Sequence, residues 1–528
     1  MPPPSRNLKL SNLRYAKNSR TKVVFKDYSP NQILLLPPSL EEMIDPNHPV
    51  RVVNQVIDNL DLDLLIKKYK GGGCSSYHPR LLLKLLVYGY LTNQYSSRKI
   101  EQATKQNIYF MWLSAMSYPD HNTINRFRGD RLNGVLKEIF SQVVLLLVEK
   151  GIITLKEAYL DGTKIEANAN RYTFVWGRSI SKSKDRIKKQ LDELWNYAES
   201  VAREELENNE PESFEKIDQE SVLRTIESID KALKGKQIDK KVKQKLNYAR
   251  KNWPGNLKKY EQQEKILGNR NSYSKTDPDA TFMRMKEDHM LNGQLKPGYN
   301  WQISTENQCI LGYTIHQTTN DTATLPSHME SLKESLGKMP ETLVADAGYG
   351  SEENYEYLET NKVEAFVKYQ YFHKEQSKKW KENPYRTENL PYNEKNDNYT
   401  CPIGQQMNFI KEKIKITDNG FRQIKRLYQA ENCNGCPVRD ICNKSKSNRI
   451  IEINERLNRY KSIIRERLTS ERGKKYRSQR PVDVEAVFGI IKWNRNYRKF
   501  LLRGLEKVEI EVGLLALSHN LSKIAARN

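Results

Sequence analysis

Three acidic residues, Asp161, Asp346 and Glu485, stand in contexts that suit metal-dependent chemistry on phosphodiesters. Asp161 and Asp346 each end a short apolar run, and glycine follows each within two residues. In open α/β sheets ligands collect at the carboxyl ends of strands, so neighbouring strands would bring both carboxylates to one point. Such a pair repels unless cations neutralise it, and Mg²⁺ takes hard oxygen ligands. For each acid alone, the alternative is a helix cap or a solvated surface charge.

Glu485 is the best candidate for a third acid, on a helix expected around residues 484–493. Lys492 lies seven positions further on and shares its face, so its ammonium could meet a phosphate. Arg480, just before the helix, could do the same. Asp483 is a rival acid, but two residues from Glu485 it points to another side. With two metal ions, one activates water or a 3′-hydroxyl and the other stabilises the leaving oxygen.

The charge of the chain favours a polyanionic partner. The 528 residues contain 88 Lys and Arg against 65 Asp and Glu, a formal net charge of +23. Nucleic acid is the commonest large polyanion, whereas the alternative is a basic protein without a special partner. Apolar stretches are too short to span a membrane, and no apolar signal core opens the chain. We therefore expect a cytoplasmic protein.

Residues 51–150 show helical patterns throughout and predict a helical domain. Around residues 119–128, Asp120 is a plausible helix N-cap, and a polar, basic helix after it suits a helix-turn-helix. The alternative is a helical bundle with a solvated face. The side chains expected to contact DNA from this helix are Asn122, Asn125, Arg126 and Arg128.

Strand and helix patterns then alternate, which predicts a mixed α/β layer. Strands are expected at 301–305 and 309–314, with Glu306 and Asn307 as their turn, and at 342–346 and 365–369. The charged residues 181–275 are expected to form an inserted antiparallel helix pair, and residues 371–470 an irregular insertion. The expected organisation is a basic arm and connector (1–50), the helical domain (51–150), a core in three parts (151–180, 276–370 and 471–528) and the two insertions.

Four cysteines late in the chain are spaced C-x31-C-x2-C-x5-C: Cys401, Cys433, Cys436 and Cys442. Four thiolates suit a tetrahedral structural Zn²⁺, although the last spacing is looser than in usual zinc ribbons. Free buried cysteines and an iron–sulfur cluster are the alternatives. Basic residues also follow the Glu485 helix, and the expected DNA contacts there are Arg495, Arg498, Lys499 and Arg503.

Several motifs together resemble bacterial insertion-sequence transposases of the DDE class, whose catalytic fold resembles RNase H. The matching segments are Asp161-Gly-Thr-Lys-Ile-Glu-Ala-Asn-Ala-Asn170, Ala345-Asp-Ala-Gly-Tyr-Gly350, Arg480-Pro-Val-Asp-Val-Glu-Ala-Val-Phe-Gly-Ile-Ile-Lys492, Leu36-Pro-Pro-Ser-Leu40, His48-Pro-Val-Arg51 and Pro119 to Arg128. The resemblance covers most of the chain and is least specific in the charged insertion.

The resemblance implies that Asp161, Asp346 and Glu485 bind two Mg²⁺ or Mn²⁺ ions, and that Lys492 completes a Tyr-Arg-Glu-Lys signature. That signature has Arg four residues and Tyr seven residues before the Glu. Here those positions hold Pro481 and Ser478, while Arg480 and Tyr476 lie slightly further back.

The implied reaction is nicking at the ends of a DNA element, followed by attack of the freed 3′-hydroxyl on target DNA. The partners would be double-stranded DNA and at least a second copy of the chain, near the bacterial nucleoid. Some relatives pass through a DNA hairpin, aided by an aromatic residue that holds a flipped base. Trp176 and Trp301 are candidates for this residue, and the alternative for each is a buried structural tryptophan. A silent DNA-binding derivative and a nuclease without strand transfer remain alternatives.

Overall fold

The computed structural model describes residues 39–69, 75–206, 217–285, 293–417 and 419–527. Most of the expected basic arm lies outside these residues. The chain divides into two units, Met1–Met43 and Ile44–Asn528. Every helix and strand named below belongs to the second unit.

The N-terminal part of this unit is helical, as its sequence predicts. Two helices begin alike: His48 and His78 each cap a helix whose first residue is proline, where the missing N–H costs nothing. Asp120 caps the helix after it, as expected, and accepts from two backbone N–H groups. The helices are α1 (Pro49–Asn59), α2 (Asp63–Ile66), α3 (Pro79–Leu91), α4 (Ser97–Gln106), α5 (Ile108–Leu113), α6 (His121–Arg126) and α7 (Leu136–Glu149).

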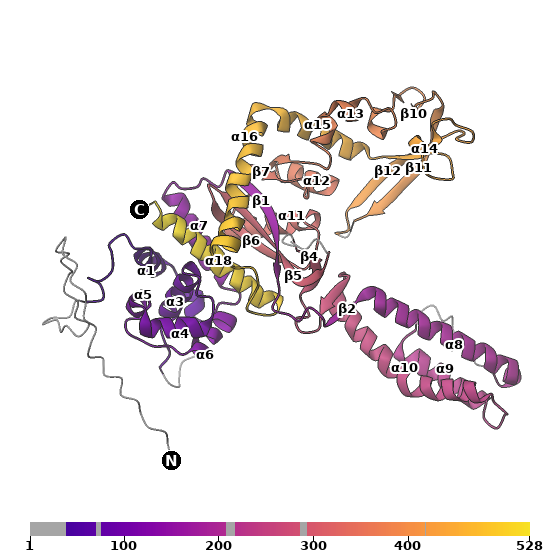
Figure 1. Ribbon diagram of the computed structural model, residues 1–528, viewed down its shortest axis with the longest axis horizontal. Coiled ribbons are helices and arrows are strands. Elements are labelled where there is room, and N and C mark those ends of the chain that lie inside the picture. Colours follow the sequence, from indigo (N-terminus) through magenta and orange to yellow (C-terminus); the bar gives the residue numbers. More distant parts are fainter. Residues whose placement is uncertain (1–38, 70–74, 207–216, 286–292, 418, 528) are drawn as a thin grey trace, which may run out of the picture. The chain divides into compact units, whose positions relative to one another are not determined.

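A mixed six-stranded sheet follows, with the order β4-β5-β1-β7-β8 and β6 paired with β5 (Figure 1). The strands β4 and β6 each pair antiparallel with β5, and β5 lies antiparallel to β1. On the other side β7 and β8 run parallel to β1. The strands are β1 (Glu157–Glu166), β4 (Thr281–Arg284), β5 (Leu295–Glu306), β6 (Cys309–His316), β7 (Thr342–Ala345) and β8 (Glu364–Val367).

The turn between β5 and β6 lies one residue later than expected. Glu306 still belongs to β5, and the turn residues are Asn307 and Gln308, both with positive φ. This left-handed pair matches the twist of a hairpin, and Asn tolerates it better than most residues. Glu306 was expected in the turn because it is polar. Its carboxylate instead accepts hydrogen bonds inside the fold from the Thr154 and Leu155 backbone N–H groups.

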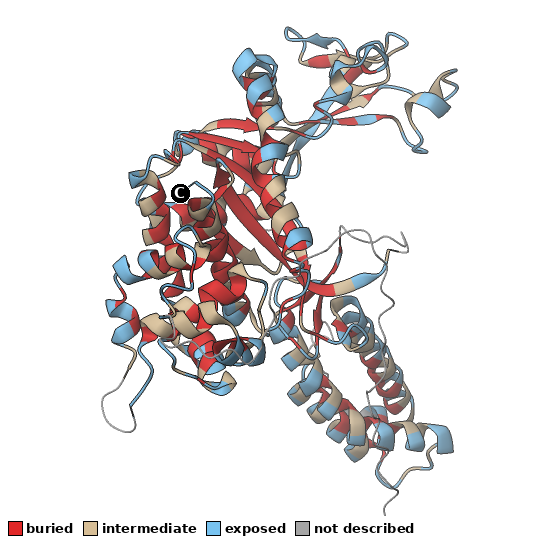
Figure 2. Ribbon diagram, turned by 60° about the vertical axis from the view of Figure 1, so that its left-hand side comes forward, coloured by how far each residue is buried: buried red, intermediate tan, exposed pale blue. Residues whose placement is uncertain are grey.

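Helix and sheet share one hydrophobic core. Helix α18 (Leu505–Ala525) is buried along almost its whole length and packs against α3, α7 and β6. Figure 2 shows this central helix and the strands as the most buried part of the chain. The buried side chains of the helical region and the sheet therefore form a single cluster. Helix α11 (Leu325–Leu336) packs against β6, and α12 (Glu352–Thr360) packs against β8.

The charged insertion contains three helices, so the expectation of a helix pair was wrong. The helices are α8 (Gly177–Leu206), α9 (Gln219–Ala232) and α10 (Lys240–Leu267). They enclose a separate apolar core, which explains how such charged segments stay folded. At their base β2 (Phe174–Trp176) pairs with β3 (Ser272–Ser274), which joins the two ends of the insertion.

The second insertion is also more regular than expected. It holds a five-stranded antiparallel sheet with a small core of its own: β9 (Tyr392–Asn393), β10 (Asn398–Thr400), β11 (Gln406–Ile416), β12 (Arg422–Ala430) and β13 (Ile450–Ile453). The short helix α13 (Lys378–Lys381) precedes these strands and α14 (Arg439–Cys442) lies between β12 and β13, while α15 (Glu455–Thr469) and α16 (Glu471–Arg480) follow them. Its exposed strands lack clean apolar alternation, which hid them from pattern reasoning.

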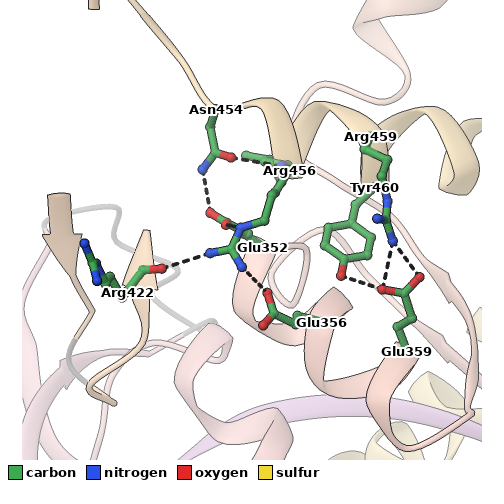
Figure 3. Close-up of polar contacts among 9 residues, drawn as sticks. Glu352, Glu356, Glu359, Arg422, Asn454, Arg456, Arg459 and Tyr460 are labelled. Atoms are coloured by element: carbon green, nitrogen blue, oxygen red, sulfur yellow. Dashed lines mark hydrogen bonds and ion pairs between the residues drawn. The ribbon is translucent and has the colours of Figure 1, made fainter. Parts of the chain in front are cut away.

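A polar contact joins this insertion to α12 (Figure 3). The Arg456 guanidinium, at the start of α15, lies 2.8 Å from Glu352 and 2.9 Å from Glu356. It also donates to the Arg422 carbonyl oxygen of β12. The tip of the β11–β12 hairpin reaches the same helix, where the Thr417 hydroxyl donates to Glu353 at 3.0 Å.

No helix among the described residues has the length and apolar character needed to cross a bilayer.

Candidate active site

Asp161 and Asp346 come from neighbouring parallel strands, as the sequence predicts. Leu160 pairs with Ala345 across β1 and β7, so the next residue of each chain segment is an aspartate at the same edge. Asp161 does not end its strand, however, because β1 continues to Glu166. Its side chain is 8% exposed and that of Asp346 is 41% exposed, so one carboxylate is buried and the other opens outward.

Glu485 reaches the same place through an unusual helical segment. Residues Pro481–Glu485 form a π-helical turn between α16 and α17 (Ala486–Gly489). An i→i+5 turn holds one residue more than an α turn, so Arg480 lies on the face that a residue four before Glu485 would otherwise take. This explains the offset from the Tyr-Arg-Glu-Lys spacing. A second π turn spans Ile490–Asn494 and carries Lys492.

The Arg480 guanidinium contacts all three carboxylates. Its Nη2 atom lies 3.0 Å from Asp161 Oδ1 and 3.8 Å from Asp346 Oδ2, and its Nη1 atom lies 2.6 Å from Glu485 Oε1. The Arg480 side chain is only 7% exposed. Three acids from separate elements thus converge on one buried cation.

These residues line a pocket of about 310 Å³, formed by Asp161, Thr163, Asp346, Arg480, Glu485, Phe488, Gly489, Lys492 and Trp493. Lys492 is 6% exposed, and its ammonium donates to the Lys164 carbonyl oxygen at 3.2 Å. Asp483 lies elsewhere, because its Oδ1 atom accepts from the Thr305 hydroxyl at 2.6 Å. Burial raises the pKa of Asp483, and the hydrogen bonds from Thr305 and the β5–β6 turn oppose this.

The donor set suits a divalent ion by its chemistry, since carboxylate oxygens are the ligands that Mg²⁺ and Mn²⁺ prefer. In this structure the Arg480 guanidinium lies between the three carboxylates. Among the described residues, no three His, Cys, Asp or Glu side chains are gathered closely enough to hold a metal ion. Arg480 therefore supplies the positive charge that the three acids need in this conformation.

The four-cysteine zinc site is not formed by the described residues either. Cys401 and Cys433 pack at the edge of the small core of the β9–β13 sheet. Cys442 Sγ accepts a hydrogen bond at 3.0 Å from the Arg449 guanidinium, and Cys433 Sγ accepts one from the Arg449 backbone. The Arg449 guanidinium therefore contacts the sulfur of Cys442 only, and its backbone N–H that of Cys433. Cys436 is part-exposed, and none of these cysteines forms a disulfide.

The residues expected to contact DNA fall into two groups. Arg128 and Arg495 are buried and hydrogen-bonded within the fold, Arg128 to the Tyr95 carbonyl and Arg495 to Ser518. Their side chains are not presented to a partner. The other group lies at the surface and comprises Asn122, Asn125, Arg126, Arg498, Lys499 and Arg503.

The second group divides again by position. Asn122, Asn125 and Arg126 line one surface pocket with Lys507 of α18. Arg498 stacks over the ring of Trp493, 4.0 Å from its centroid, and Trp493 lines the acid pocket. The three exposed basic residues after the second π turn therefore follow directly on a segment that borders the acids.

The two tryptophans proposed as base-holding residues differ in burial. Trp301 is fully buried and packs edge-on against Phe488, behind the pocket. Trp176 is half-buried beside Phe174 and Phe282 at the base of the three-helix insertion. Trp301 is thus a core residue in this structure.

Lys368 is a pocket neighbour that sequence reasoning missed. It directly follows β8, as Asp346 directly follows β7, and its N–H donates to the Ala345 carbonyl at 3.3 Å. Burial and then Arg480 lower the pKa of Lys368, while Asp346 and Glu485 act in the opposite direction. Its place at the end of a parallel strand was the signal that could have identified it.

Comparisons with known families agree with this picture. Residues 400–525 match the Transposase DDE domain family, and residues 38–130 match a transposase domain family, DUF772. Glu485, Arg480 and Lys492 fall within the first match, whereas Asp161 and Asp346 lie between the two. No curated protein and no solved structure gives a match to this chain. These two matches, a DUF772 transposase domain near the start of the chain and a transposase DDE domain at its end, support an insertion-sequence DDE transposase.

Proposed function

We propose that this transposase cuts DNA at the ends of its element and joins the freed 3′-hydroxyls to target DNA, at the pocket around Arg480. The observation that carries the proposal is the convergence of Asp161, Asp346 and Glu485 on one cation position. The strand order β6-β5-β1-β7-β8, with the last two strands parallel to β1, supports an RNase H-like core. We infer that this core comprises residues 151–180, 276–370 and 471–528.

In this mechanism the three carboxylates would hold Mg²⁺ or Mn²⁺, two ions per site. The bound ions would lower the pKa of an attacking water and stabilise the leaving oxygen. The Arg480 guanidinium would give up its carboxylate partners and donate to a DNA phosphate, for which its planar donors are suited. The ammonium groups of Lys492 and Lys368 would neutralise the same backbone.

The reaction has two chemical steps. The first hydrolyses one phosphodiester bond, and the second exchanges one phosphodiester bond for another. Water attacks the phosphorus and the bond to the 3′-oxygen breaks, leaving a 3′-hydroxyl and a 5′-phosphate. That 3′-hydroxyl then attacks a target phosphodiester, forms a new bond and releases a target 3′-hydroxyl. Joining two element ends requires two active sites, so we propose that at least two copies assemble on DNA.

A nicking assay tests the site directly. With Mg²⁺ and a labelled duplex carrying the flanking inverted repeat, D161N, D346N and E485Q are each expected to lose at least about 10³-fold in rate, because each removes a carboxylate that would hold the metal ions. The matched control is E471Q on α16, whose carboxylate is 90% exposed and pairs with Lys474.

The control variant should cut like the wild type. Wild-type protein that binds the duplex but never cuts it would favour a silent DNA-binding derivative. Cutting without joined products would favour a nuclease without strand transfer. Equal cutting by the three acid variants would show that the reaction occurs elsewhere.

The basic surface beside the pocket gives a second prediction. Neutralising Arg498, Lys499 and Arg503 to Gln is expected to weaken binding to all duplex sequences alike and to reduce the slope of log K against log[salt] by about 2 to 3, since each phosphate contact contributes about 0.9. Fluorescence anisotropy over a salt series measures this slope. Changing Lys378, Lys379 and Lys381 of α13 to Gln removes the same charge elsewhere, and an equal effect from both sets would contradict a specific surface.

A further inference from the structure

A buried polar network lies behind the two aspartates. Its members are Asn300 and Gln302 of β5, Asp321 in the loop before α11, and Tyr349 in the loop after Asp346. Gln302 and Tyr349 are fully buried and Asn300 is 1% exposed. Burying this many polar side chains is costly unless each finds partners, so their arrangement requires an explanation.

Gln302 is the centre of the network. Its Nε2 group donates to Asp321 Oδ1 at 3.0 Å and to Asn300 Oδ1 at 2.9 Å. Its Oε1 atom accepts from the Tyr349 hydroxyl. Asn300 donates to the same Asp321 oxygen at 2.6 Å. One amide side chain therefore ties a strand to two separate loops.

The strand β1, which carries Asp161, has a glycine at the position that faces the Gln302 amide. Gly162 pairs with Gln302 across β1 and β5, and the Gln302 side chain lies over it. A Cβ atom on Gly162 would come within 2.8 Å of Gln302 Cδ, closer than such atoms approach. The glycine directly after Asp161 thus leaves room for Gln302 to cross the strand.

The loop that carries Asp346 meets the other end of the network. At Gly348 a Cβ atom would lie 2.9 Å from Asp346 Oδ1 and 3.9 Å from the Asp321 Cβ, so the two acidic side chains flank one backbone position. Burial raises the pKa of Tyr349 far above its usual range, and Asp321, Asp161 and Asp346 raise it further. Its hydroxyl therefore stays protonated and donates to Gln302.

We propose that Gln302 is a positioning residue, which fixes the strand of Asp161 against the loop of Asp346 so that both carboxylates keep the spacing a divalent ion needs. The inference rests on the proposed function of these acids. Gln302 itself touches neither substrate nor ion. Side chains that orient metal ligands typically change metal affinity or activity by about 10- to 100-fold when altered.

The test uses a reversal of the hydrogen bond between Gln302 and Asp321. In Q302E a carboxylate replaces the donating amide and faces Asp321, so Mn²⁺ affinity by calorimetry and the nicking rate are both expected to fall at least about tenfold. In the double variant Q302E/D321N the amide introduced at position 321 can donate to the carboxylate introduced at position 302. Both quantities should then return to within about threefold of wild type. D321N alone retains the oxygen that accepts both amides and should bind Mn²⁺ like wild type.

Each outcome decides between alternatives. If the wild-type protein neither binds Mn²⁺ nor nicks DNA, the proposed function itself is wrong. Wild-type activity with unchanged Mn²⁺ affinity in Q302E would end the positioning role. Loss of Mn²⁺ binding in D321N alone would mean that the Asp321 charge acts on the ion directly, which also contradicts the inference.

Thermal unfolding in chelator shows whether each variant folds. If Q302E does not fold, Y349F carries the test, because it removes only the hydroxyl that donates to Gln302. It is expected to lower Mn²⁺ affinity severalfold, and an unchanged affinity would overturn the proposal.

Discussion

Replacing Arg480 with glutamine is expected to lower the free energy of unfolding by about 3 to 5 kcal/mol in the presence of a chelator. The reason is the burial of the ion pair: Arg480 is 7% exposed and Asp161 is 8% exposed, with 3.0 Å between them. Removing the guanidinium leaves Asp161 buried and uncompensated beside Asp346 and Glu485. Denaturant titration in EDTA measures the loss.

Adding Mn²⁺ should restore much of the lost stability in R480Q, because the ion supplies the missing charge to the same acids. The matched control is R472Q on the same helix. Arg472 pairs with Glu364 at 2.6 Å but is 53% exposed, so its loss should cost at most about 1 kcal/mol. Equal stability of R480Q and wild type in EDTA would show that Arg480 is not the counter-ion of the acids.

The second large effect is expected at Gly350, in the loop after Asp346. A Cβ atom there would lie 2.8 Å from Tyr369 Cα and closer still to the Lys368 carbonyl oxygen. Both are backbone atoms at the end of β8, so the loop itself must move. G350A is expected to cost about 3 kcal/mol of stability and to reduce nicking strongly, because Asp346 moves with the loop.

G489A provides the comparison for G350A, since a Cβ atom on Gly489 would meet nothing within 4 Å. Gly489 lies in α17, where alanine is favoured over glycine by about 0.5 to 1 kcal/mol. The two alanine variants should therefore shift the unfolding midpoint in opposite directions. A G350A protein as stable as wild type would show that the close approach relaxes without cost.

The positions of Asp161 and Asp346 could be predicted because each follows a short apolar run, which is a strong local signal even though β1 continues beyond Asp161. Arg480 was also expected at the site, but its contacts with all three acids could not be predicted, because no residue pattern in Pro481–Glu485 indicates a π turn. The partner of Cys442 was equally hidden, since Arg449 reaches the sulfur only through the fold of the β9–β13 sheet. Local patterns thus identified the acids, while the groups that neutralise or hold them depended on tertiary contacts.

The same distinction explains the insertions. The helices α8, α9 and α10 have charged faces around a narrow apolar stripe, and a short stripe does not show how many helices share it. Gln302 was missed for another reason. Its strand was expected, but a buried amide within a strand gives no sign of which loops it will bind.

The contact between Arg456 and Glu352 makes the β9–β13 insertion difficult to remove. Glu352 is completely buried at the start of α12, in the segment that follows Asp346, and its ion pair comes from a residue beyond the insertion's sheet. A truncation that replaced residues 371–470 with a short linker would delete Asn454 and Arg456. The Glu352 carboxylate would then be buried without a partner for its charge. Shortened or chimaeric versions of this chain would therefore need an apolar residue at position 352. The insertion thus contributes to the stability of the core that it interrupts.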